Sequence, residues 1–230
     1  MSLETQGFII LKNIIDEQTI SSLIEDLSKI EPSEILNRKN REVYGLRNLL
    51  NLSPKVKEFS ASKIVREIAE KYLGEKAKVV RAIYFDKTPK ANWKVPWHQD
   101  LTISVCQKLE IEGFTVWTKK AGIHHVQPPL EILERMLTLR FHLDDADETN
   151  GALKVLPETH KFGRLSATEI QNLKSKQTVS LCKTEKGDCL LMKPLLVHSS
   201  SAGLNPQHRR VIHLEFSAES LPKGLQFYGS

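Results

Sequence analysis

The sequence predicts a single domain that is mainly β with flanking helices (α+β), arranged as a double-sheet jelly roll. Two helix-like segments occupy the first third of the chain, and several short strand-like segments with turn signals follow them. No internal repeat, low-complexity stretch or linker divides the 230 residues. We therefore expect residues 1–230 to form one domain.

The chain begins with a strand and a helix. Residues 7–15 are typical of a strand and turn, and Asp16 is suited to cap a following helix. Apolar residues then recur at helical spacing, at Ile20, Leu23, Ile24, Leu27 and Ile30. The polar segment 31–51 that follows is expected to be a loop.

A second helix is marked by its ends. Ser53 is a suitable cap, Pro54 fits the first helical position, and Gly74 ends the pattern. We expect a buried stripe that consists of Ile64, Val65, Ile68, Ala69, Tyr72 and Leu73. The stripes of both helices indicate core packing.

The rest of the chain is rich in strand signals. Predicted strands cover residues 78–86, 136–143, 151–156, 178–183, 189–192 and 211–216. Asn150-Gly151 is a strong turn dipeptide. Ser166 and Glu169 form a capping box for a short helix that extends to Leu173.

Residues 101–129 fit no regular element, and a long irregular segment inside a compact domain is usually functional or disordered. Its aromatic and apolar content argues against disorder. Taken singly, its basic residues indicate a solvated loop, and together they are candidates for a lid. They are Lys119, Lys120, His124 and His125.

Composition narrows the function. The net charge of +5 is mild and spread along the chain, which favours an anionic small ligand over nucleic acid. No apolar stretch approaches the length of a membrane helix, and no signal peptide is visible, so we expect a cytoplasmic protein with no membrane partner. The cysteines are three in number and form no Cys-x-x-Cys pair, which argues against disulfides and structural zinc; they are Cys106, Cys182 and Cys189.

A metal site is indicated by three residues. His98 and Asp100 lie two apart beside a predicted strand, so their side chains project to one face, and His198 follows the apolar run 190–197. Two histidines and one carboxylate leave three positions of an iron ion open. A lone His-x-Asp pair is weak evidence, but Arg209 lies eleven residues beyond His198 and offers the planar fork that binds a carboxylate.

In these motifs the chain resembles the phytanoyl-CoA dioxygenase (PhyH) family, which includes ectoine hydroxylase. The motifs occur in the family's order over roughly residues 7–217. They are Trp97-His98-Gln99-Asp100, Asp144-Asp145 through Asn150-Gly151-Ala152-Leu153, Pro157-Glu158-Thr159-His160, and His198-Ser199-Ser200 with Arg209. The motif Pro157-Glu158-Thr159-His160 departs from the family's Pro-Gly-Ser-His. We expect the loss of the glycine to alter a loop.

The resemblance implies a cupin-like double-stranded β-helix that uses iron(II), 2-oxoglutarate and O2. It implies an oxidoreductase that hydroxylates a small molecule and releases succinate and CO2. His98, Asp100 and His198 would be the metal-binding, catalytic residues, and Arg209 with Ser200 would bind 2-oxoglutarate. Because Asp100 occupies the place where halogenating relatives have a small residue, halogenation is not expected.

Arg210 is an alternative anchor for 2-oxoglutarate. Strand parity places Arg209 on a more polar face and Arg210 on an apolar face. The polar face also carries Val211, His213 and Glu215, and the apolar face carries Ile212, Leu214 and Phe216. Because a polar face suits a wet pocket, parity favours Arg209.

The substrate itself is not identified by any motif. Trp97 and Trp117 are candidates for a pocket wall, with core packing as the alternative. Arg140 lies on an otherwise apolar strand, where its charge needs a partner. The candidates for that partner are an anionic substrate, Asp144 and Glu215. The oligomeric state stays open.

Two other functions compete with the oxygenase. One is a non-catalytic β-barrel that binds a metal or a small ligand, for which a dicarboxylate anchor has no evident use. The other is a zinc or manganese enzyme on a related barrel, and such sites usually contain a His-x-His pair that this chain lacks.

Overall fold

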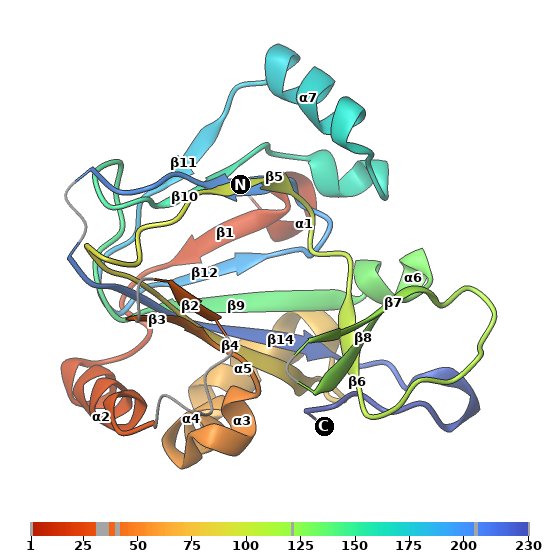
Figure 1. The fold of residues 1–230 in the computed structure, drawn as a ribbon, viewed down its shortest axis with the longest axis horizontal. Coiled ribbons are helices and arrows are strands. Elements are labelled where there is room, and N and C mark those ends of the chain that lie inside the picture. The colour runs from red at the N-terminus through yellow and green to blue at the C-terminus, as the bar shows by residue number, and fades with distance from the viewer. Residues whose placement is uncertain (1, 31–36, 40–41, 121, 205–206, 230) are drawn as a thin grey trace.

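The computed structural model describes residues 2–30, 37–39, 42–120, 122–204 and 207–229, and its strands form three antiparallel sheets (Figure 1). The large sheet has the order β1 (Phe8–Leu11), β12 (Cys189–Met192), β9 (Met136–His142), β14 (Arg209–Ser217), β4 (Lys78–Lys87), β3 (Glu42–Leu46) and β2 (Asn37–Lys39). The small sheet has the order β11 (Ser180–Cys182), β10 (Leu153–Val155), β13 (His198–Ser200) and β5 (Val95–His98). The third consists of β6 (Ile103–Val105), β8 (Ile123–Gln127) and β7 (Thr115–Lys120).

The central strands of the large sheet, β12, β9 and β14, are largely buried on both faces, as the alternation along β12 illustrates. Leu190 and Met192 pack with Leu153 and Val155 of the small sheet. Leu191, which points the other way, belongs to the core beneath the helices. The expected mainly β fold with two facing sheets and flanking helices is therefore confirmed, although the described strands do not close into a barrel.

Helices cover the outer faces of the sheets. On the large sheet these are α2 (Glu17–Ser28), α3 (Leu49–Leu52), α4 (Pro54–Ser60) and α5 (Lys63–Leu73) (Figure 1). On the small sheet, α7 (Ala167–Lys176) packs Ile170 and Leu173 against Trp97. Among the described residues, the remaining helical turns are α1 (Leu3–Gln6), α6 (Leu130–Glu134) and two 3-10 turns at Thr159–Phe162 and Pro222–Gly224.

The predicted helix starts are confirmed. Asp16 accepts a hydrogen bond from the Thr19 amide at 2.8 Å and caps α2. Ser166 and Glu169 form the expected reciprocal capping box of α7. These local signals were readable because each cap satisfies donors within the same helical turn.

The prediction of one continuous helix from Ser53 to Gly74 is wrong. Ser53 does cap a helix, but α4 ends at Ser60, and Ser62, in an extended conformation, begins α5. The expected burial of Ile64 is also wrong, because its side chain is exposed at this new helix start.

Two segments expected to be irregular contain strands. In the predicted loop 31–51, β3 pairs with β4, while residues 31–36 and 40–41 lie outside the described residues. In 101–129, β8 pairs with both β6 and β7. Short strands and a register shift between Thr115 and Thr118 obscure the alternation that would have predicted this sheet.

Two composition-based expectations concern thiols and membranes. Cys106, Cys182 and Cys189 are free, in line with the absence of a disulfide framework. Among the described residues, every helix is too short or too polar to cross a membrane.

A candidate metal centre and its cavity

His98 and His198 face one another in the small sheet. They are direct partners in the antiparallel pair β5–β13, and their ring centroids lie 4.2 Å apart. Asp100 follows β5, where its amide donates to the carbonyl of Pro194 at 2.9 Å. One potential ligand atom from each of the three residues lies within 4.8 Å of the others. The structure thus brings together the three residues that the sequence indicates.

Hydrogen bonds to the backbone orient both imidazole rings. The Nδ1 atom of His98 lies 2.8 Å from the carbonyl oxygen of Pro96, and that of His198 lies 2.8 Å from the carbonyl oxygen of Leu196. Because a carbonyl oxygen can only accept, each Nδ1 carries the proton and each Nε2 keeps a lone pair. Both Nε2 atoms lie 3.7 Å from an oxygen of Asp100. This is the arrangement in which neutral histidines ligate a metal.

The protonation states also suit a cation. Burial raises the pKa of the Asp100 carboxyl, but the neighbouring His198 and His98 outweigh it and hold that pKa well below its ordinary value. Burial lowers the pKa of His198 to about 4, against the opposing effect of Asp100. At neutral pH the site therefore offers an ionised carboxylate and a neutral imidazole.

The three residues open into a cavity of about 380 Å³ between the sheets. Its apolar lining includes Ile83 and Phe85 on β4, together with Trp93, Val95 and Leu101. A cavity of this size matches those that hold small molecules. His98 is partly exposed, whereas His198 is buried, so the centre is accessible from the side of His98.

Arg209 lines the same cavity and is buried. One of its terminal nitrogens donates to the carbonyl of Gly151 at 3.0 Å, and its Nε has no hydrogen-bond partner in the described structure. Ser200 also lines the cavity and donates to the same carbonyl at 2.8 Å. Arg209 and Ser200 are therefore held by one backbone oxygen. The single hydroxyl proton of Ser200 is used in that bond, whereas Arg209 keeps the N–H of Nε for a further acceptor.

Arg210 points elsewhere. It forms a two-point ion pair with Asp144, at 2.8 Å from Nε and 2.6 Å from the second nitrogen. It is not among the described residues that line the cavity. The neighbouring positions on β14 thus have opposite surroundings, as the alternation of a strand requires.

Arg140 belongs to a chain of buried polar groups across the cavity floor. It donates to Nδ1 of His213 at 2.8 Å, and Nε2 of His213 donates to Glu215 at 3.1 Å. Glu215 also accepts from Arg81. Of the partners proposed for Arg140, neither Asp144 nor Glu215 binds it directly, and its Nε has no partner among the described residues.

The two tryptophans singled out from the sequence are not among the described residues of the cavity wall. Trp97 packs under α7, and Trp117 packs against the apolar cluster beside β6 and β8. Trp93 lines the cavity instead. Of the four basic residues considered for a lid, Lys120 and His125 reach the cavity wall, from β7 and β8.

Sequence reasoning missed the polar side chains of β4. Lys87 is fully buried and donates to the hydroxyl of Ser200 at 2.7 Å, and it is the cross-strand partner of Arg209. Arg81 lies on the same face of β4 and lines the cavity with Ile83. The sequence of 78–87 gave no clear signal for them, because each face of the strand carries three apolar and two charged residues.

The residues fit iron(II) and 2-oxoglutarate. Two imidazole nitrogens and a carboxylate on one side are the donor set of the facial triad that leaves positions open for cosubstrate and oxygen. The buried, partly unsatisfied guanidinium of Arg209 is suited to a carboxylate, which is acceptor-only and pairs with the planar fork.

The sequence model of the family described as phytanoyl-CoA dioxygenase (PhyH) matches residues 3–211. The chain belongs to the PhyH family. It is thus an iron(II)- and 2-oxoglutarate-dependent oxygenase, as the resemblance implied. A comparison with curated protein sequences gave no match.

Solved structures support the same fold for this PhyH member. AviO1 from Streptomyces viridochromogenes Tue57 is 18% identical with a TM-score of 0.69, covering 96% of this chain and 93% of its own. EctD from S. alaskensis with bound Fe is 17% identical with a TM-score of 0.70, and the match covers 94% of this chain and 74% of EctD. HygX from Streptomyces hygroscopicus with nickel, 2-oxoglutarate and hygromycin B bound is 14% identical with a TM-score of 0.66, and the match covers 94% of this chain and 84% of HygX. The architecture is the expected cupin-like double-stranded β-helix.

Proposed function

We propose that this PhyH member hydroxylates a small organic molecule in the cavity beside His98, Asp100 and His198. The observation that carries the proposal is the metal-ligand triad at the wall of a cavity of about 380 Å³ that also exposes Arg209. A non-catalytic binding protein would need either the metal ligands or the carboxylate anchor. An oxygenase of this class needs both of them in the same cavity.

Each polar group has a defined task. His98, Asp100 and His198 would hold iron(II) from one side, with their orientation set by the backbone carbonyls of Pro96 and Leu196. Arg209 would bind the carboxylate of 2-oxoglutarate remote from the metal, and Ser200 would assist by holding the Gly151 carbonyl that also positions Arg209. The apolar wall would exclude water and position the carbon–hydrogen bond to be oxidised.

The overall conversion is R–H + 2-oxoglutarate + O2 → R–OH + succinate + CO2. When bound, the iron and 2-oxoglutarate supply the oxidising power, with one oxygen atom entering succinate and the other entering the product. The protein needs no general base for the removal of a hydrogen atom, and we assign none.

The test is an anaerobic titration of the purified protein with iron(II) and 2-oxoglutarate, followed by the visible charge-transfer absorption of the chelate. We expect the band to appear in the wild type and to be absent from His198→Ala. Admission of O2 should then release succinate in an amount that depends on 2-oxoglutarate. A folded wild-type protein that binds iron and shows neither band nor succinate would refute the proposal.

A further inference from the structure

Arg140 is a buried guanidinium at the cavity wall, and it forms no ion pair with a carboxylate among the described residues. One of its terminal nitrogens donates to Nδ1 of His213 at 2.8 Å, and its Nε has no hydrogen-bond partner in the described structure. An imidazole nitrogen accepts one N–H group but does not balance the charge of an arginine. Because a buried charge without a counter-ion is costly, Arg140 is suited to an anion in the cavity.

Neighbouring side chains hold this guanidinium in place. Nε2 of His213 donates to Glu215 at 3.1 Å, which leaves Nδ1 of His213 as the acceptor for Arg140. The guanidinium carbon of Arg140 also lies over the Phe85 ring, 5.8 Å from its centroid. Arg140 is therefore oriented by the protein before a ligand binds.

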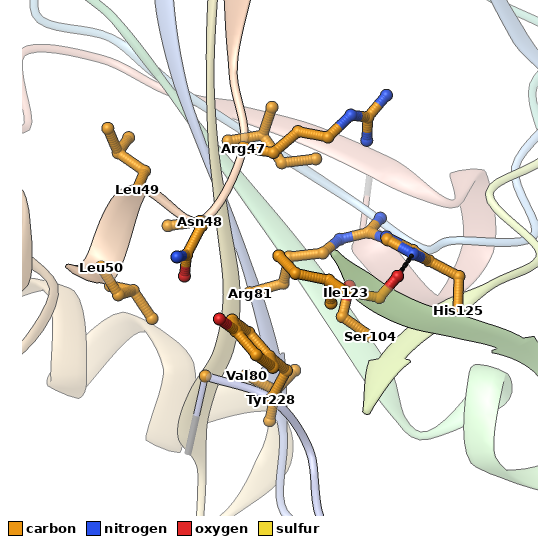
Figure 2. A pocket seen from close by; sticks show the side chains of 13 residues that line it. Arg47, Asn48, Leu49, Leu50, Val80, Arg81, Ser104, Ile123, His125 and Tyr228 are labelled. Atoms are coloured by element: carbon orange, nitrogen blue, oxygen red, sulfur yellow. Dashed lines mark hydrogen bonds between the residues drawn. The ribbon is translucent and has the colours of Figure 1, made fainter. Parts of the chain in front are cut away.

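Arg81 has different surroundings, although it lines the same cavity. Its guanidinium pairs with Glu215 and donates to the Thr102 carbonyl at 3.3 Å. Figure 2 shows Arg81 in the adjoining recess, which it lines together with His125. Since Glu215 already pairs with Arg81, it does not serve as the counter-ion of Arg140.

The charge of Arg140 acts on both the metal triad and the proposed anchor. Burial and then the charge of Arg140 lower the pKa of Arg209 to about 9. Burial lowers the pKa of His198 to about 4, and Arg140 has a smaller effect in the same direction. Burial also lowers the pKa of Arg140 itself, and Asp100 opposes that shift. Because such effects fall off with distance, Arg140 lies near the path from the metal ligands to Arg209.

Strand register separates Arg140 from Arg209. Arg140 is the cross-strand partner of His213, which lies four residues beyond Arg209 on β14. Four residues correspond to about 13 Å of strand, so the two guanidiniums enter the cavity from different positions. 2-Oxoglutarate has a carboxylate at each of its ends, and one guanidinium for each end accounts for both arginines.

We propose that Arg140 binds the carboxylate of 2-oxoglutarate next to the keto group, while Arg209 binds the distal carboxylate. This inference rests on the proposed function, since it adds a second cosubstrate-binding residue to that site. With iron(II) bound, the charge of Asp100 would be directed to the metal, and the carboxylate next to the keto group would be the counter-ion of Arg140. His213 and Glu215 are positioning residues, because they act through Arg140.

The experiment compares two 2-oxo acids by anaerobic titration of the iron(II)-loaded protein, followed by the charge-transfer band. 2-Oxopentanoate has the same 2-oxo acid end as 2-oxoglutarate, with a methyl group in place of the distal carboxylate. Arg140→Gln should weaken both acids by the same factor, about tenfold or more, because both contain the carboxylate next to the keto group. It should also shift the wavelength of the band, since that carboxylate belongs to the absorbing chelate.

Two matched variants show what the other arginines do. Arg209→Gln should weaken 2-oxoglutarate to the level of 2-oxopentanoate and leave 2-oxopentanoate unchanged, because the distal carboxylate alone is affected. Arg210→Gln should leave both affinities unchanged, because that guanidinium is bound to Asp144 outside the described cavity lining.

Arg140→Lys carries the same comparison should Arg140→Gln fail to fold, as judged by circular dichroism. Lysine keeps the positive charge but lacks the planar fork, so both acids should again weaken by the same factor. Unchanged affinity for both acids in the folded Arg140 variant would overturn the inference. A loss confined to 2-oxoglutarate would overturn it as well, because Arg140 would then bind the distal carboxylate. Absence of the band from the wild type would instead refute the oxygenase proposal.

Discussion

His98 and His198 are cross-strand partners in the β5–β13 pair, and each ring is held by the carbonyl two residues before it. The two strands are separated by about a hundred residues of sequence, yet each places a histidine Nε2 at 3.7 Å from an oxygen of Asp100. A metal centre of this kind is preorganised by the sheet, because ladder register and ring tautomer are set without the metal.

Replacement of either histidine should remove iron binding. We expect His98→Ala and His198→Ala to lose stoichiometric iron(II), as measured by metal analysis after gel filtration, while circular dichroism stays unchanged. His208→Ala is the control, because His208 bonds Asp86 at a partly exposed position away from the triad. Full iron content in both ligand variants would contradict the assignment.

Arg209→Ala should weaken 2-oxoglutarate more than iron. The loss of hydrogen bonds to a charged carboxylate costs about 1.5–3 kcal/mol, which is roughly a ten- to 150-fold increase in Kd. Arg210→Ala is the matched control, because that guanidinium is bound to Asp144 outside the cavity lining. Titration of the charge-transfer band distinguishes the two, and a larger effect in Arg210→Ala would reverse the strand-parity assignment.

The affinity for 2-oxoglutarate should fall as the pH rises above neutrality. Burial and then the charges of Arg209 and Arg140 lower the pKa of Lys87 to about 7. The protonated amine attracts an anion at Arg209, so its contribution is complete below pH 7 and declines as the pH rises through that value. Iron-loaded protein should show this trend between about pH 6 and 9, and Lys87→Met should flatten it. An identical pH profile in the variant would show that Lys87 does not contribute.

Gly151→Ala should disturb the anchor through the backbone. Gly151 has φ +82°, and an added Cβ would lie 2.5 Å from the Ser201 carbonyl and 2.9 Å from Nζ of Lys87. We expect a loss of at least about 2 kcal/mol of unfolding free energy together with weaker 2-oxoglutarate binding. Gly122→Ala, at φ +76° with no atom within 4 Å, is the control for the φ effect alone. Chemical denaturation gives the comparison, and equal losses would refute the steric explanation.

The fold was predictable where signals are local. Caps such as Asp16 and the alternation in Met136–His142 depend on residues within one turn or one strand. The loop predictions for 31–51 and 101–129 were wrong because these segments contain strands that depend on pairing. β3 pairs with β4, which lies far along the chain, and β7 pairs with β8 across a register shift. The edge strand β7, whose side chains are mostly exposed, also lacks the apolar alternation that marks a half-buried strand.

The sequence by itself determined the family and indicated His98, Asp100 and His198 as the candidate ligand set, because spaced ligand types and an ordered series of motifs are properties of the chain. Tertiary structure decided which side chains share the cavity. It placed Trp93 in the wall in place of Trp97 and brought Arg47 beside Lys120, from segments that sequence reasoning treated as loops. The physical reason is that period-two alternation assigns a face within one strand, whereas long-range pairing decides which faces meet.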